Sequence, residues 1–170
     1  MSCLKLNRNI RVGYRFLTTQ SLSENEMNVC VDTGRSARDY GVATVTKEFI
    51  IAAPPAVVWA AIRNFGSPVK LFPGVLSDAK LDGDVRTVKF ANGLVVRERL
   101  VTADDEARRL VWTVIEGRTT HHNGSLQVYS DDNNSRVVWI TDFLPDTLKD
   151  PISQLVEHGS AAMKQALSNH

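Results

Sequence analysis

The chain has 170 residues, of which 43% are hydrophobic and 23% charged, and its formal net charge is +1 at pH 7. This size and composition predict one globular domain with an ordinary apolar core. Because the net charge is close to zero, the protein has no general field that attracts nucleic acid or an acidic membrane, and we expect neither as a partner. The sequence has no apolar run near the ~18 residues that a membrane span requires.

The first 42 residues lack the pattern of a folded domain. Four basic residues precede the first acidic residue, Glu24, and they are Lys5, Arg8, Arg11 and Arg15. A basic, acid-poor leader is typical of an organelle transit peptide. The alternative is a tail outside the fold, with Met27 as an alternative start. We favour the tail, which predicts that residues 1–42 are disordered and that the protein is cytoplasmic.

The cysteines and histidines predict neither a disulfide nor a metal site. Cys3 and Cys30 both lie in the leader and are interpreted as free thiols. His121 and His122 are adjacent, so on a strand they point to opposite faces and cannot hold one metal together. The other two histidines are far from them in the sequence. We therefore expect no metal and no cofactor.

The first predicted elements are a strand and a short helix. Residues 43–51 alternate between two faces in the manner of a β-strand. Pro54 and Pro55 end this strand, because proline cannot donate to a ladder, and they begin a helix well. Apolar side chains then recur at helical spacing, at Val58, Trp59, Ile62 and Phe65. The broken stretch 67–75 predicts a second short helix or a turn.

A run of strands follows, and a long helix ends the chain. The strand-like segments, each bounded by Gly, Asp or Asn, are VLSDAKLDG, VRTVKFANG, LVVRERLVTADD, RRLVWTVIEG, NGSLQVYSDDNN and SRVVWITDFLP. Their turns predict hairpins of an antiparallel meander. Asp150 followed by Pro151 predicts a capped helix N-terminus, and an apolar stripe continues from there to the C-terminus. This order of elements predicts an α+β fold with helices segregated from an antiparallel sheet.

Two stretches resemble the SRPBCC or START-like superfamily, which includes bacterial polyketide cyclase/dehydrase-type proteins. FIIAAPPAVVWAAIRNFGSPVKLFP is similar to the opening of that superfamily: an apolar strand, an alanine-proline step and Val-Trp at the start of a helix. GDVRTVKFANGLVVRERLVTADDEARRLVWTVIEG is similar to its second, third and fourth strands. The second stretch also resembles plant abscisic acid receptors, through Glu98, Arg99 and Leu100. The gate and latch sequences of those receptors are not reproduced, so we do not expect hormone reception.

The resemblance implies a helix-grip fold over residues 43–170. In that fold a curved antiparallel sheet, here of about six to seven strands, wraps around the long C-terminal helix, and two short helices follow the first strand. An apolar cavity lies between the sheet and the helix. Members of the superfamily include binders, carriers and a few enzymes, so the fold by itself does not assign an activity.

Glu98 interrupts the apolar face of its strand, which otherwise consists of Leu94, Val96 and Leu100. If this face lines the cavity, a buried carboxylate needs water, a cation or a ligand hydroxyl, because leaving it unpaired costs several kcal/mol. It would then anchor a polar ligand group or act as a general acid or base. The alternative is a register slip or a bulge that turns Glu98 outward, to pair with Arg97 or Arg99. The resemblance favours the cavity.

The other candidate ligand-binding residues are Phe90, Leu94, Val96, Trp112, Val114, Ser125, Trp139, Thr141, Leu155, Gly159 and Met163. One assignment depends on which face of its strand points inward. The resemblance places Ser125, with Asn123, in a polar network with Glu98, whereas hydrophobicity favours the opposite face of the same strand. Both alternatives remain open at this point.

Similar alternatives apply to the aromatic and helical candidates. Trp112 either stacks on a flat ligand or is ordinary core. On the last strand, Trp139, Thr141 and Phe143 are preferred as the cavity face over the residues between them. In the terminal helix, Gly159 could leave room for a ligand, and plain packing of the helix on the sheet is the alternative.

Two functions follow from these expectations. The first is binding of a hydrophobic small molecule, such as a lipid or polyketide, in the cavity. The second is a polyketide cyclase or dehydratase that uses Glu98 as acid or base. Binding is preferred, because the sequence offers one inward acid and no evident partner base. The ligand and the oligomeric state are not encoded in any motif.

Overall fold

The computed structural model describes residue 41 and residues 43–168. Residues 1–40 and 42 of the predicted disordered leader, with its two cysteines and Met27, lie outside the described residues. In chain order the elements are β1 (Ala43–Ile51), α1 (Pro55–Ile62), the 3₁₀ turn η2 (Pro68–Lys70), β2 (Leu76–Asp82), β3 (Val85–Phe90), β4 (Val95–Asp104), β5 (Arg109–Glu116), β6 (His121–Asp131), β7 (Asn134–Leu144), the 3₁₀ turn η3 (Asp146–Leu148) and α2 (Lys149–Leu167).

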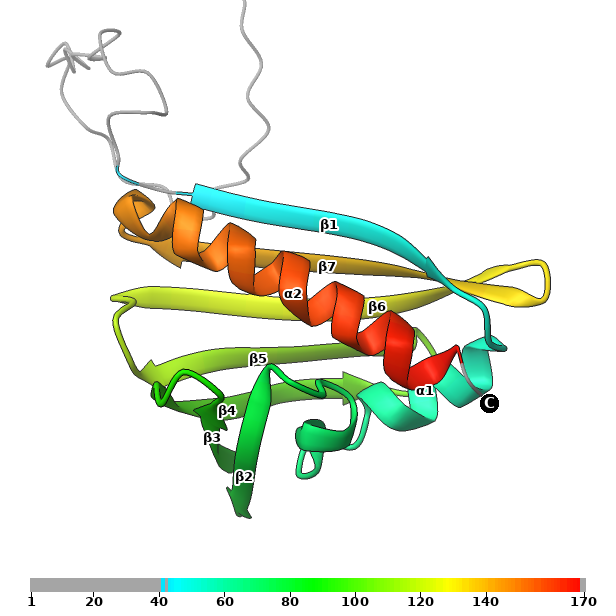
Figure 1. Cartoon of the computed structure of the whole chain (residues 1–170), viewed down its shortest axis with the longest axis horizontal. Helices are drawn as coiled ribbons and strands as arrows, with labels where there is room; N and C mark the ends of the chain where they lie inside the picture. Colours follow the sequence, from blue (N-terminus) through cyan, green and yellow to red (C-terminus); the bar gives the residue numbers. More distant parts are fainter. Residues whose placement is uncertain (1–40, 42, 169–170) are drawn as a thin grey trace, which may run out of the picture. The chain divides into compact units, whose positions relative to one another are not determined.

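The strands form one antiparallel sheet with the order β1-β7-β6-β5-β4-β3-β2. Strands β2 to β7 follow one another as a meander, and β1 joins the far edge beside β7. The sheet is curled, and α2 lies across one of its faces (Figure 1). The α+β helix-grip architecture predicted from the sequence is therefore confirmed. The second short helix expected after the first strand is the single turn η2.

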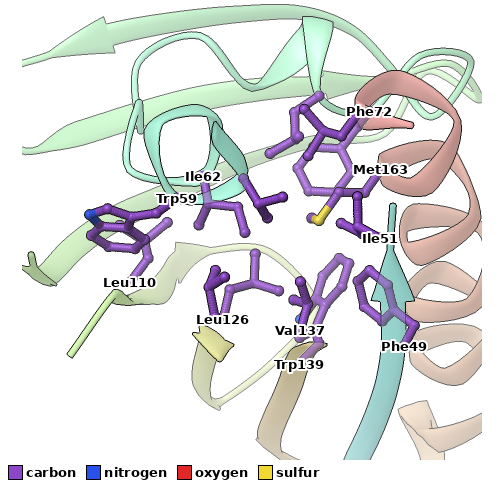
Figure 2. Packing of buried hydrophobic residues seen from close by; sticks show 14 of the residues in the cluster. Phe49, Ile51, Trp59, Ile62, Phe72, Leu110, Leu126, Val137, Trp139 and Met163 are labelled. Atoms are coloured by element: carbon purple, nitrogen blue, oxygen red, sulfur yellow. The ribbon is translucent and has the colours of Figure 1, made fainter. Parts of the chain in front are cut away.

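The core lies between the curled sheet and its helices. Alternate residues of β7 are buried over its whole length, as expected for a strand with one face on the core. Figure 2 shows how aromatic and aliphatic side chains from β1, β5, β6, β7, α1 and α2 meet in this core. Met163 of α2 is completely buried there, together with Ile51 of β1.

A close approach of α2 to the sheet occurs at Gly159. A Cβ added to Gly159 would lie 2.9 Å from Cη2 and Cζ3 of Trp139 on β7. Such a distance is too short for ordinary van der Waals contact, so the missing side chain lets the indole pack directly against the helix backbone. The space that the glycine provides is thus taken by Trp139, which favours the alternative of plain packing between the helix and the sheet.

The N-terminus of α2 differs from the sequence prediction. Asp150 and Pro151 were expected to be the cap and the first helical residue, but α2 begins at Lys149 and its N-cap, Leu148, makes no side-chain capping bond. The 3₁₀ turn η3 runs directly into the helix, so backbone turns take the place of an aspartate cap. Asp150 instead lies in the first turn, where its negative charge complements the helix dipole.

The Gly159 contact yields a stability prediction. Gly159→Ala should lower the free energy of unfolding by about 1–3 kcal/mol, because overpacking against the Trp139 ring outweighs the better helix propensity of alanine. Urea denaturation measures this difference. Combining Gly159→Ala with Trp139→Phe should cost less than the sum of the two single changes, since the smaller ring relieves the clash. Additive losses would contradict the contact.

Candidate functional site: an apolar cavity between the sheet and α2

A cavity of about 200 Å³ lies between the sheet and α2, with walls that are mainly apolar. Its lining comes from β2 to β7, from the segment around η2 and from the N-terminal half of α2. Among the candidates from the sequence, those along its walls are Phe90, Leu94, Val96, Glu98, Trp112, Val114, Trp139, Thr141, Leu155 and Gly159.

Two candidates do not line the cavity. Ser125 is buried, but Leu126 is the neighbour that lies on the cavity wall, so Ser125 points to the other face of β6. The polar network of Ser125 and Asn123 with Glu98 therefore does not form. The inward face of β6 is the one that hydrophobicity favoured. Met163 lies deeper, in the packed core between α2 and β1.

Glu98 points inward and has a cation for its partner. Its Oε2 accepts a hydrogen bond from Nε of Arg86 on the neighbouring strand β3, at 2.6 Å. Both side chains are about nine-tenths buried. Arg86 also donates through Nη1 to the carbonyl oxygen of Phe65 at 3.0 Å, and its guanidinium lies 4.0 Å from the centre of the Phe65 ring. The position of Arg86 is therefore fixed by the Glu98 carboxylate, by the Phe65 carbonyl and by the Phe65 ring.

The sequence contained a signal for this partner. Arg86 stands two and four residues before Val88 and Phe90, and side chains at that spacing share one face of a strand. Because Phe90 was expected at the cavity, Arg86 should have been expected there too. Arg97 and Arg99, the partners expected for an outward-pointing Glu98, do not pair with it. Arg97 pairs with Glu116, and Arg99 pairs with Asp84.

His122 is a cavity residue that the sequence reasoning missed. It shares the inward face of β6 with Gly124 and Leu126, which follows once the apolar face is taken as the inner one. Its Nδ1 accepts a hydrogen bond from the backbone N–H of Val114 at 3.3 Å. That bond places the proton of the neutral ring on Nε2. The pKa of His122 is lowered to about 4, mainly by burial and also by the charge of His121, while the charge of Asp142 opposes this shift.

The strand registers place the inward polar groups in one row across the sheet. Arg86 pairs with Glu98, Glu98 with Val114, and Val114 lies beside His122. Strands in a sheet are about 4.8 Å apart, so Glu98 and His122 are separated by about 10 Å with an apolar residue between them. Glu98 and His122 are therefore two separate polar groups in an apolar cavity and do not form one acid–base pair.

Two polar atoms of cavity residues have no hydrogen-bond partner within the described residues. They are Nε1 of Trp139 and Oγ1 of Thr119, and both are buried. Trp139 contacts Trp112 edge to face, with ring centres 6.2 Å apart.

Neither a metal site nor a membrane span is found in the described part of the chain. Among those residues no group of three His, Cys, Asp or Glu side chains is arranged to hold a metal ion. None of the described helices is long and apolar enough to cross a membrane.

Comparison with known proteins identifies the family. The model of the polyketide cyclase/dehydrase and lipid transport family matches residues 42–169, so the chain belongs to that family. Among proteins with curated descriptions, none is significantly similar to it in sequence.

Several solved structures share the fold. An uncharacterised protein from Bacillus thuringiensis is 23% identical with a TM-score of 0.68, covering 74% of this chain and 98% of its own. The protein XoxI from Bacillus cereus is 25% identical with a TM-score of 0.67, covering 75% of this chain and 96% of its own. Norcoclaurine synthase from Thalictrum flavum, in complex with dopamine and hydroxybenzaldehyde, is 19% identical with a TM-score of 0.60, and the match covers 82% of this chain and 94% of the synthase.

The ion pair gives a prediction about stability. Glu98→Gln should lower the free energy of unfolding by about 3–5 kcal/mol, because it leaves the Arg86 charge buried and unpaired. The double variant Arg86→Met/Glu98→Leu should recover most of that loss, since it removes both charges and keeps the volume. Urea denaturation of the single and double variants measures both effects. A single-variant loss below about 1 kcal/mol would show that the pair is solvated.

His122 gives a prediction about pH. Its folded-state pKa lies below the unfolded value, so the unfolded chain takes up the proton first and stability is lost as the pH falls from 6.5 to 4. Between pH 7 and pH 5 the native protein should lose about 2 kcal/mol more than the variant His122→Gln. Chemical denaturation at both pH values provides the comparison. Equal losses in the two proteins would mean that His122 is charged or solvated in the fold.

Proposed function

We propose that the protein binds a hydrophobic small molecule in the cavity between the sheet and α2. The observation that carries this proposal is a cavity with mainly apolar walls inside an otherwise well-packed domain. Empty apolar volume costs stability, and a ligand that fills it recovers the lost contacts. Membership of a family described by cyclase, dehydrase and lipid-transport activities is consistent with this class of ligand.

The second candidate function is catalysis with Glu98 as general acid or base. Norcoclaurine synthase, an enzyme of similar fold, shows that the fold can host chemistry. The contacts of Glu98 favour a structural role instead, because Arg86 satisfies its charge and Phe65 fixes Arg86 in turn. A general base needs access to the proton that it removes. We therefore place binding ahead of catalysis.

A pair of neighbouring substitutions tests where the ligand binds. Val96 lines the cavity, whereas Val95 is 52% exposed on the opposite face of β4. The uncharged two-ring probe 2-acetylnaphthalene should bind the native protein in a calorimetric titration. Val96→Phe fills the cavity and should weaken this binding by about tenfold or more, whereas Val95→Phe should change it less than about twofold.

Circular dichroism and thermal unfolding control for folding of both variants. A probe that binds equally well to Val96→Phe and to the native protein sits elsewhere on the surface. That result would contradict the proposal even if the affinity were high.

A further inference from the structure

The cavity lining carries a net positive charge at neutral pH. Arg86 and Glu98 form a close pair, so together they add no net charge. His122 has a pKa of about 4 and is therefore neutral at pH 7. The remaining ionisable residue of the lining is Arg118, and its guanidinium has no ion-pair partner among the described residues. One cation of the lining is thus free to pair with a ligand.

Arg118 lies where the cavity opens to solvent. The exposed lining residues at this end are Leu94, Gly117, Arg118 and Pro151. The register that pairs Arg97 with Glu116 puts the start of β4 beside the end of β5. The backbone N–H of Thr120 donates to the carbonyl oxygen of Leu144 at 2.9 Å, and η3 and α2 follow that residue. The β5–β6 connection and the start of α2 therefore lie at the same end of the sheet (Figure 1).

The position of Arg118 decides how an anion can bind. A carboxylate carried into the apolar interior would lose its water without gaining a partner, because Arg86 is already paired. A carboxylate at the opening keeps part of its hydration and forms charge-assisted hydrogen bonds with the guanidinium. The nearby acidic residues Asp146 and Asp150 do not line the cavity. The opening thus offers an anion a cation and presents no free carboxylate to repel it.

The volume and the walls limit the rest of the ligand. An apolar cavity of about 150 Å³ is large enough for benzene, so about 200 Å³ suits a body of roughly one to two rings. The rings of Trp112 and Trp139 supply flat aromatic surface inside. An apolar interior with a cation at its opening fits a molecule that has an apolar body and one anionic end.

We propose that the cavity binds an amphipathic carboxylate, with an apolar body of one to two rings inside and the carboxylate at the opening, paired with Arg118. This inference rests on the proposed function and narrows it to one ligand class. It makes Arg118 a binding residue that sets specificity, since its charge distinguishes a carboxylate from a neutral group of the same shape.

Two probes of nearly equal shape test the inference on the full chain by calorimetric titration at pH 7 and low salt. They are 2-naphthoate, which is charged, and 2-acetylnaphthalene, which is neutral. The native protein should bind 2-naphthoate at least as tightly as the ketone. Arg118→Gln should weaken the binding of 2-naphthoate by at least about tenfold, because the charge-assisted bonds are lost, and should change that of the ketone by less than about twofold.

Lys149→Gln is the matched control. It also removes one positive charge at this end of the domain, but Lys149 is exposed at the start of α2 and does not line the cavity. The affinity for 2-naphthoate should therefore change by less than about twofold. Circular dichroism and thermal unfolding control for the folding of both variants.

A second measurement needs no variant. Raising sodium chloride from about 0.05 M to about 0.5 M should weaken the binding of 2-naphthoate by about threefold or more, because an exposed ion pair is screened by salt. The affinity for the ketone should not fall. A 2-naphthoate affinity that is independent of salt would contradict a pair with Arg118.

The outcomes separate this inference from the proposed function. If neither probe binds the native protein, the proposed function fails, and the inference with it. If the ketone binds and Val96→Phe weakens it, but Arg118→Gln leaves 2-naphthoate unaffected, the cavity binds ligands and only the role of Arg118 is wrong. Equal losses in Arg118→Gln and Lys149→Gln would replace the pair by a general positive field. Binding of 2-naphthoate that Arg118→Gln abolishes and Val96→Phe does not affect would place the anion on the outer surface, which also overturns the inference.

Discussion

The buried pair of Arg86 and Glu98 is the interaction on which the account of this cavity depends. A carboxylate on the inner face of β4 would be too costly to bury alone, and the guanidinium from β3 makes it tolerable. The same guanidinium binds the Phe65 carbonyl, so the pair also fixes the segment that follows α1. Because the two charges cancel, the cavity can keep an apolar character with polar side chains in its wall.

Most of the fold could be predicted from the sequence, because each element carried its own local signal. Alternation and turn residues marked all seven strands, and the prolines before Val57 marked the start of α1. The start of α2 was wrong by a few residues, since the 3₁₀ turn η3 leads into the helix and Asp150 is not its cap. A turn of that kind depends on how the chain leaves β7, which local sequence does not reveal.

The candidate site was predicted in part, and the misses have physical reasons. Inward residues of β4 and β5 follow from alternation, but contacts between strands depend on register. The Arg86–Glu98 pair needs the register of β3 with β4, although the position of Arg86 relative to Val88 and Phe90 pointed inward. The inward face of β6 was left open between resemblance and hydrophobicity, and the structure places Leu126 and His122, rather than Ser125, on the cavity wall. The space at Gly159 could not be assigned, since only packing shows that the Trp139 ring fills it.

The most direct test of the central claim is a crystal structure of the protein grown with saturating 2-acetylnaphthalene. One molecule should lie between the sheet and α2, against Trp112 and Trp139, with Arg86 still paired to Glu98. A cavity closed by its own side chains, or a ligand bound only on the outer surface, would contradict the claim that this cavity is a binding site.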